Sequence, residues 1–227
     1  MTFSDTGFSR KEQRILETFS ARLAVPRPKT KKRLFVGTIG LVGSGKTAVA
    51  ELLSRELGAA VISADAIRIA LRKKRAGYGR VEDICGMLAQ TILARGGSVI
   101  VDSDFADAQK RNSFKKLAKD RGAESYFVRT VKQDIDTMIG TAITRTYRKG
   151  VDDFFTGAGT TWQGKQRAAV VKLREMWRRI PHHYLWSKDG GGAWIQKTIP
   201  QVYTIIDTSR PSTVAKQVRD VARALRR

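Results

Sequence analysis

The amino-acid sequence predicts an α/β fold, a three-layer sandwich in which helices cover both faces of a five-stranded parallel sheet. From residue 34 onward, short apolar runs alternate with longer segments of helical periodicity, which is typical of parallel strands joined by crossover helices. A glycine-rich turn separates the first apolar run from the first helical segment. The chain has 227 residues, 41% of them apolar and 28% charged, which is enough for one domain with a full core. We therefore expect one domain over residues 34–227.

Residues 1–33 have a different pattern from the rest of the chain. Residues 9–23 place apolar side chains at helical spacing behind Ser9, a residue type that often caps helices. Residues 24–33 combine two prolines with five Lys and Arg residues and show no periodicity. We expect an amphipathic helix followed by a basic linker.

The elements of the main domain follow in order along the chain. Strands are expected at residues 34–39, 59–63, 98–102, 125–129 and 202–206. Helices are expected at residues 46–57, 65–74, 81–95, 107–121, 132–148, 165–179 and 211–226. Residues 149–200 interrupt the alternation of strands and helices, and all four tryptophans of the chain lie in this stretch. We expect it to form a helical lid or insertion rather than part of the sheet.

The formal net charge of +22 is the most unusual global property of the chain. A positive field of this size attracts phosphate-rich molecules, so a nucleic acid is one candidate partner. The alternative is that the basic residues cover solvated surface, since they occur along the whole chain. No apolar run approaches the roughly 20 residues of a membrane-spanning helix, and the N-terminal residues lack the apolar core of a signal peptide. Because Cys85 is the only cysteine and lies in an apolar pattern, we expect it to be buried, and we expect a cytoplasmic protein.

Residues 40–47, GLVGSGKT, match the pattern G-x-x-x-x-G-K-[ST] at every fixed position and stand between a predicted strand and a predicted helix. Glycines let such a loop turn its N–H groups toward phosphate oxygens, and the helix N-terminus adds partial positive charge. Lys46 is expected to reach the β- and γ-phosphates, and the Thr47 hydroxyl to bind Mg²⁺. The predicted nucleotide-binding residues are Gly40, Leu41, Val42, Gly43, Ser44, Gly45, Lys46 and Thr47. The sequence therefore predicts binding of ATP or a related triphosphate together with Mg²⁺.

Asp102 ends the apolar run of the segment GGSVIVDSDF. A carboxylate at the end of a neighbouring strand faces the same crevice as the glycine-rich loop, so Asp102 is expected to bind Mg²⁺ directly or through water. The alternative is that Asp102 only caps a helix or shapes a turn. Ser103 follows Asp102, where hydrolysing motor proteins usually have a glutamate that polarises water. This favours phosphoryl transfer over hydrolysis, although Asp104 is a possible substitute for that glutamate.

Asp65 follows the predicted strand at 59–63 and should lie beside the glycine-rich loop. A carboxylate there can accept the proton of an acceptor hydroxyl as it attacks the γ-phosphoryl group. Arg68, one helical turn further on, is on the same face and would bind an anionic or polar group of the acceptor. The alternative is that Asp65 only caps the following helix and that Arg68 is a surface residue.

Taken together, GLVGSGKT, SADAIR and GGSVIVDSDFADAQKR, followed by LAKDRGAES, resemble the P-loop kinases. That family includes the phage polynucleotide 5′-hydroxyl kinase, zeta toxins and chloramphenicol phosphotransferase, and its members are often called AAA family ATPases. The resemblance covers about residues 34–148 and returns at IIDTSRPSTVAKQV. It implies a P-loop NTPase sheet with strand order 2-3-1-4-5. It also implies that Asp65 is the catalytic base, that Arg68 binds the acceptor, and that arginines of a helical lid close on the transferred group.

The resemblance does not decide which arginines belong to the lid, and two pairs are candidates. Arg145 and Arg148, at the end of the helix after the fourth strand, are the expected catalytic lid arginines, and Arg174 with Arg178 are the competing pair. Asp104 departs from the family pattern, in which a neutral residue is expected. The tryptophans either pack the insertion onto the domain or stack on bases of single-stranded nucleic acid.

We therefore predict an ATP- and Mg²⁺-dependent phosphotransferase that moves the γ-phosphoryl group to a hydroxyl. The acceptor is the 5′-end of a nucleic acid, a nucleoside or another small molecule. The alternative is a nucleotide-hydrolysing switch that binds a nucleic acid or a protein partner.

Overall fold

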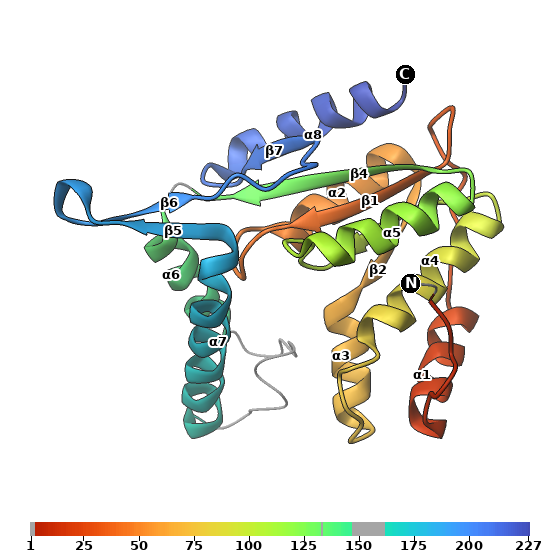
Figure 1. Ribbon diagram of the computed structural model, residues 1–227, viewed down its shortest axis with the longest axis horizontal. Helices are drawn as coiled ribbons and strands as arrows, with labels where there is room; N and C mark the ends of the chain where they lie inside the picture. Colours follow the sequence, from red (N-terminus) through yellow and green to blue (C-terminus); the bar gives the residue numbers. More distant parts are fainter. Residues whose placement is uncertain (1–2, 133, 147–161) are drawn as a thin grey trace.

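A parallel sheet of five strands forms the centre of the computed structural model, which describes residues 3–132, 134–146 and 162–227 (Figure 1). The strand order is β2-β3-β1-β4-β7, and every neighbouring pair is parallel. The strands are β1 (Leu34–Ile39), β2 (Ala59–Ser63), β3 (Ser98–Asp102), β4 (Glu124–Val131) and β7 (Thr204–Asp207). Counted along the chain, β7 is the fifth strand of this sheet, because β5 and β6 belong to a separate one. The predicted strand order 2-3-1-4-5 is therefore confirmed.

Eight helices accompany the strands in the described part of the chain. They are α1 (Arg10–Ala21), α2 (Lys46–Leu57), α3 (Ala64–Lys73), α4 (Val81–Ala94), α5 (Ala108–Asp120), α6 (Ile135–Thr146), α7 (Trp162–His183) and α8 (Pro211–Leu225). The sequence predicts each of them, with ends that differ by four residues at most.

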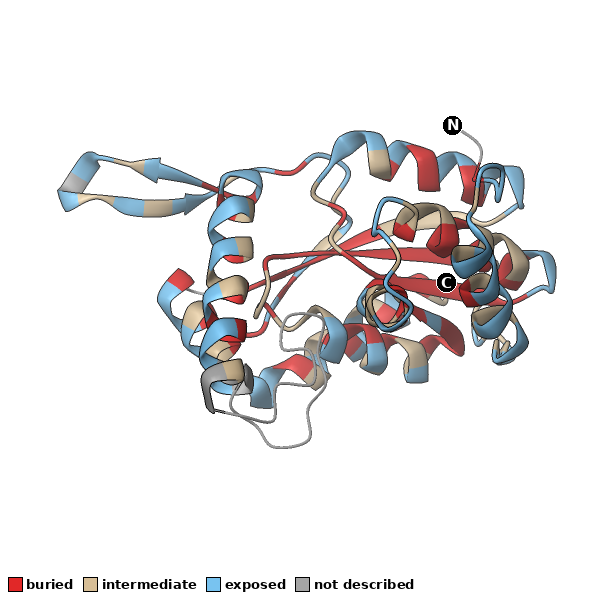
Figure 2. Ribbon diagram, turned by 90° about the horizontal axis from the view of Figure 1, so that it is seen from below, coloured by how far each residue is buried: buried red, intermediate tan, exposed pale blue. Residues whose placement is uncertain are grey.

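Helices cover both faces of the sheet, and each face has its own apolar core. On one face, Phe35 of β1 packs against the rings of Phe105, Phe114 and Phe127, and α4 and α5 cover this cluster with α3 and α1 beside them. On the other face, α2 and α8 pack over Val36. All residues of β1 and β3 are buried, which is typical of parallel strands covered on both sides (Figure 2). The predicted three-layer sandwich is confirmed.

The N-terminal segment packs onto the domain. Ser9 caps α1 as predicted, in a reciprocal pair of hydrogen bonds with Glu12. Ile15 is buried, and the ring of Phe3 lies 4.6 Å from that of Phe114. A side chain at Gly86 of α4 would collide with Phe3, since its Cβ would stand 2.2 Å from the ring. The helix of residues 1–33 is therefore part of the core of the first face.

The described part of residues 149–200 contributes no strand to the main sheet, as expected, but it is not helical throughout. After α7 the chain forms a separate antiparallel pair of strands, β5 (Tyr184–Ser187) and β6 (Ala193–Gln196), joined through the short 3-10 helix η1 (Asp189–Gly191). Trp186 lies opposite Trp194, and their rings stand 5.1 Å apart. This hairpin extends away from the main sheet in both views (Figures 1 and 2). Strands of four residues, stabilised by cross-strand aromatic pairs, have too little periodicity to be recognised in a sequence.

Two further sequence expectations concern burial and the membrane. Cys85 is buried as predicted, and burial raises the pKa of its thiol to about 12. Within the described ranges, none of the helices combines the length and the apolar character that a bilayer crossing requires.

Candidate functional site

A cleft of about 200 Å³ lies at the carboxyl ends of β1 and β3, above the N-terminus of α2. The glycine-rich loop, the start of α3 and the residues after β3 form its walls, and α6 and α7 contribute to its far side. The register of the sheet explains this meeting, since Ser63 pairs with Asp102 and both strands end at the same edge. Crevices at the carboxyl ends of parallel strands are where α/β proteins bind ligands.

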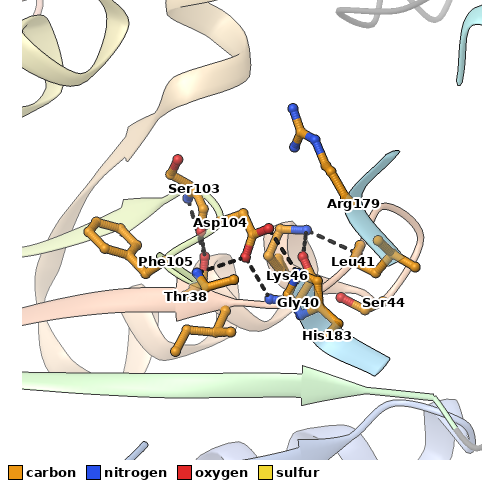
Figure 3. A network of polar contacts seen from close by, with 12 residues as sticks. Thr38, Gly40, Leu41, Ser44, Lys46, Ser103, Asp104, Phe105, Arg179 and His183 are labelled. Atoms are coloured by element: carbon orange, nitrogen blue, oxygen red, sulfur yellow. Dashed lines mark hydrogen bonds and ion pairs between the residues drawn. The ribbon is translucent and has the colours of Figure 1, made fainter. Parts of the chain in front are cut away.

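The loop between β1 and α2 has the conformation that its glycines permit. Gly43 and Gly45 both have φ of 86°, a region that residues with a Cβ rarely adopt. A Cβ at Gly43 would stand 2.6 Å from the carbonyl oxygen of Met138, so α6 packs directly on the loop. Lys46 Nζ donates to the carbonyl oxygens of Gly40 at 2.7 Å and Leu41 at 3.0 Å (Figure 3). The loop thus holds its lysine at the mouth of the cleft, beside the positive end of α2.

Thr47 and Asp102 meet as the sequence predicts. Thr47 Oγ1 donates to Asp102 Oδ2 at 2.8 Å, and Thr38 Oγ1 approaches the other carboxylate oxygen at 3.5 Å. Asp102 is only 7% exposed, and burial raises the pKa of its carboxyl against the effect of these hydrogen bonds. Asp102 ends β3, whereas Asp107 caps α5, so the alternative that Asp102 is a helix cap is wrong.

The pair of Thr47 and Asp102 fits a magnesium ion. A hydroxyl and a carboxylate oxygen are hard ligands of the kind that Mg²⁺ prefers, and Mg²⁺ usually takes its remaining ligands from water and substrate phosphates. In the part of the chain that the structure describes, no cluster of three His, Cys, Asp or Glu side chains could hold a metal ion by itself. The site therefore fits an ion that arrives with a phosphate-bearing ligand.

Asp65 and Arg68 both line the cleft. Their side chains form an ion pair in which Arg68 Nη1 lies 2.7 Å from Asp65 Oδ1. The cap of α3 is Ser63, whose Oγ accepts from the backbone N–H of Ala66 at 3.2 Å. The alternative that Asp65 is the helix cap is therefore wrong. Its side chain is 58% exposed and stands free of a capping bond at the edge of the cleft.

The predicted lid arginines Arg145 and Arg148 are not tested by the described residues, and the competing pair does not line the cleft. Arg145 belongs to the last turn of α6, but its side chain is outside the description, and Arg148 lies outside the described residues. Of the competing pair, Arg174 and Arg178 are both exposed and do not line the cleft.

Among the described residues of α7, Lys172 and Arg179 line the cleft. Lys172 is buried and donates to the carbonyl oxygen of Ala142 at 3.2 Å. The sequence analysis missed the spacing of Lys172, Met176 and Ile180, which follow one another at intervals of four residues. These three residues form one buried stripe of the helix.

Asp104 joins the glycine-rich loop to the end of α7, a role that sequence reasoning missed. Its Oδ2 lies 2.9 Å from Nε2 of His183, and its Oδ1 accepts from the backbone N–H of Gly40 at 3.3 Å (Figure 3). Burial alone would raise the pKa of Asp104, but the hydrogen bond and charge of His183, together with Lys46, hold it well below the ordinary range. Arg129 of β4 adds a second connection, because its guanidinium donates to the carbonyl oxygens of His183 and Lys197.

The comparisons with known proteins agree with this architecture. A family model described as an AAA domain matches residues 35–154, which is more than half of the chain. No match is found among curated proteins. A candidate kinase from Chloroflexus aurantiacus has a similar structure, with a TM-score of 0.55 and 17% sequence identity over 86% of this chain and 99% of that chain. The protein APE1195 matches with a TM-score of 0.53 and 17% identity over 87% of this chain and 98% of its own.

A further solved structure is that of the Mycobacterium tuberculosis APS kinase in complex with AMPPNP and APS. It has a TM-score of 0.49 and 19% identity, over 86% of this chain and 98% of that chain. At sequence identities this low, the structural matches show only that the folds are similar. The family model, in contrast, is matched by the sequence of residues 35–154 and shows the family. The chain therefore belongs to the AAA domain family, and its fold is that of the P-loop nucleoside triphosphatases.

Proposed function

We propose that the protein is an ATP- and Mg²⁺-dependent phosphotransferase that moves the γ-phosphoryl group of ATP to a hydroxyl acceptor. The observation that carries this proposal is the position of Asp65. Its carboxylate lines the same cleft as Lys46, Thr47 and Asp102, and it is not used as a helix cap. A carboxylate that can accept a proton therefore lies beside the glycine-rich loop, which supports the proposal.

The donor half of the site consists of the glycine-rich loop and the start of α2. On binding of ATP, Lys46 exchanges its two carbonyl partners for oxygens of the β- and γ-phosphates. Thr47 and Asp102 would hold Mg²⁺, which would neutralise negative charge on the phosphate oxygens. Lys172 and Arg179 face the same space from α7 and stabilise the negative charge of the transferred group.

The acceptor half begins at Asp65. The acceptor oxygen forms a bond to the γ-phosphorus while the bond from that phosphorus to the bridging oxygen breaks, so that ADP leaves. The proton of the acceptor hydroxyl passes to the Asp65 carboxylate. Arg68 holds Asp65 in place through their ion pair and presents its guanidinium to the acceptor.

The contacts of two residues, Ser103 and Asp104, favour transfer over hydrolysis. Ser103, in the position where hydrolysing relatives usually have a glutamate, is hydrogen-bonded to Lys110 at 2.8 Å. Asp104, the other candidate for polarising a water molecule, accepts hydrogen bonds from Gly40 and Ala106 and is paired with His183. The Asp104 carboxylate therefore connects the glycine-rich loop with α7 and is not available to polarise a water molecule.

The proposal is tested with γ-labelled ATP and a panel of hydroxyl compounds that includes 5′-hydroxyl oligonucleotides, nucleosides and sugars. Asp65→Asn is expected to lower the rate of transfer at saturating substrates by about 100-fold or more, because it removes the base. ATP affinity, measured by calorimetry, should stay at the wild-type value, since Asp65 does not belong to the phosphate loop. Asp120→Asn is the matched control, because Asp120 is exposed and paired with Lys116 on α5, away from the cleft.

Label that appears only as inorganic phosphate with every acceptor would contradict the phosphotransferase. It would favour the alternative, a nucleotide-hydrolysing switch. If Asp65→Asn transferred label as fast as Asp120→Asn, the proposed role of Asp65 as the catalytic base would be contradicted.

A further inference from the structure

Among the described residues, two hollows adjoin the cleft on the side of α3 and α5. Both share Arg68 and Ser103 with the cleft, and both are lined by Lys110, which the cleft does not contain. The first hollow, of about 180 Å³, includes the carboxyl of Glu82. The second, of about 250 Å³, reaches the last turns of α7 at Arg178 and Arg179. A molecule whose hydroxyl lies at Asp65 therefore has space for its remaining atoms beyond Arg68.

Within the described chain, Lys110 donates its hydrogen bonds to neutral groups, and the carboxylates of Glu82 and Asp104 add favourable electrostatic interactions. The Nζ of Lys110 donates to Ser103 Oγ at 2.8 Å and to the carbonyl oxygen of Asp104 at 3.1 Å, and it lies 4.5 Å from the centre of the Phe105 ring. Desolvation lowers the pKa of Lys110 by more than the charges of Glu82 and Asp104 raise it. A partly buried ammonium group of this kind is stabilised by an anion.

The second hollow is lined by three further cations around Lys110, namely Arg68, Arg178 and Arg179. Arg68 is paired with Asp65, and Arg178 and Arg179 share the single carboxylate of Glu175. The two carboxylates that line this hollow are already engaged in the fold. Asp104 is bonded to Gly40 and His183, and Asp107 accepts from the backbone N–H of Lys110 at 2.7 Å as the cap of α5. The N-terminus of α5 adds its partial positive charge at the same place. The first hollow is less suited to an anion because the carboxyl of Glu82 lies in it.

We propose that the second hollow binds an oxyanion of the acceptor, a carboxylate or a phosphate ester, with Lys110 as the residue that selects it. This inference rests on the proposed phosphotransferase and narrows its acceptor to hydroxyl compounds that carry a negative group. Arg68 then lies between the reacting hydroxyl and the oxyanion, and Lys110 gains a hydrogen-bonded anion, which no carboxylate of the described residues provides.

The first test compares acceptors that differ by one oxyanion, with γ-labelled ATP as donor: glycerol and glycerol 3-phosphate, glucose and gluconate, and adenosine and adenosine 3′-monophosphate. The wild-type protein should transfer label to the charged member of a pair in preference to the neutral one. Lys110→Met should lower kcat/KM for the charged acceptor by about 10- to 100-fold and leave the KM for ATP unchanged. Lys116→Met, an exposed lysine of the same helix, is the matched control, and Lys110→Gln tests whether a neutral donor suffices if the methionine variant folds poorly. Equal transfer to both members of the pairs would overturn the inference.

The second test does not depend on transfer. The protein is saturated with Mg²⁺ and AMPPNP, which occupies the phosphate loop, and is then titrated with inorganic sulfate by calorimetry. Sulfate should bind the wild type and Lys116→Met, and binding should be lost in Lys110→Met. Sulfate binding of this pattern without transfer to any acceptor would uphold the oxyanion site and contradict the proposed function. Transfer to neutral acceptors without sulfate binding would uphold the function and overturn the oxyanion site.

Discussion

Asp104 carries a charge where the family resemblance implies a neutral residue, and its contacts explain why. The carboxylate lies between the backbone N–H of Gly40 and the ring of His183, so one residue connects the glycine-rich loop with the end of α7. His183 is 1% exposed and comes from a helix that starts at Trp162. A sequence pattern does not reveal such a pair, because the two residues are far apart along the chain and each has an ordinary local role.

The pairing of Asp104 predicts a pH-dependent contribution to stability. Because the pKa of Asp104 in the folded protein lies below the value of about 3.9 expected in the unfolded chain, its carboxylate stabilises the fold above that pH. This contribution is lost as the pH falls toward the folded-state pKa. Asp104→Asn should therefore lower the free energy of unfolding by about 1–3 kcal/mol at pH 7, and the difference from wild type should shrink below about pH 4.

Urea denaturation across this pH range measures the effect. Asp120→Asn, which removes an exposed carboxylate, is the control and should change the free energy of unfolding by less than about 0.5 kcal/mol. A difference between Asp104→Asn and wild type that is the same at pH 7 and pH 3 would contradict the assignment.

At the scale of elements, α7 shows what a helical pattern leaves undecided. The sequence predicts a helix at 165–179, and the structure has one, but which of its basic residues face the cleft depends on how the helix is rotated against α6. Contacts of Met176 and Ile180 with the core around Met138 set that rotation. They place Lys172 and Arg179 at the cleft and leave Arg174 exposed.

This orientation of α7 predicts that its arginines differ in function. Arg179→Gln should lower kcat for phosphoryl transfer by about 100-fold, because it removes a cation that faces the transferred group. Arg174→Gln, on the same helix but exposed, should keep the wild-type kcat. Single-turnover rates with γ-labelled ATP distinguish the two variants. An equal loss of rate in both would contradict the orientation of α7.

At the scale of the whole molecule, the segment of residues 1–33 belongs to one packed unit with the sheet, at least in its described part. Ile15 is 4% exposed and shares a core with Ile67, Leu88 and Phe114. Amphipathic periodicity indicates that the helix has an apolar face, but it does not indicate what covers that face. The complementary surface forms only when α3, α4 and α5 are in place.

A substitution in α1 tests this packing. Ile15→Ala should lower the free energy of unfolding of the whole domain by about 2–4 kcal/mol, because it leaves a cavity under α1. Arg14→Ala, on the exposed side of the same helix, should change it by less than about 0.5 kcal/mol. Both values come from urea denaturation followed by circular dichroism. If Ile15→Ala matched Arg14→Ala, α1 would not be part of the cooperative unit.

The sequence by itself determined the sheet and the donor half of the site. Short apolar runs identify buried parallel strands, and the spacing of GLVGSGKT places Lys46 and Thr47 on a helix that starts at the sheet edge. Asp102 could be located from the sequence as well, since it ends a strand beside that loop. Such features depend on residues close together in the chain, where local conformation and hydrogen bonding decide the outcome.

Only the tertiary structure decided the remaining contacts: the pairing of Asp104 with His183, the choice of Arg179 over Arg174, the docking of α1 and the hollow around Lys110. Each of these contacts joins segments that are far apart in the sequence, and no local pattern of residues links one segment to the other. Their relative position follows from the packing of complete helices on a complete sheet, which no stretch of the sequence specifies alone.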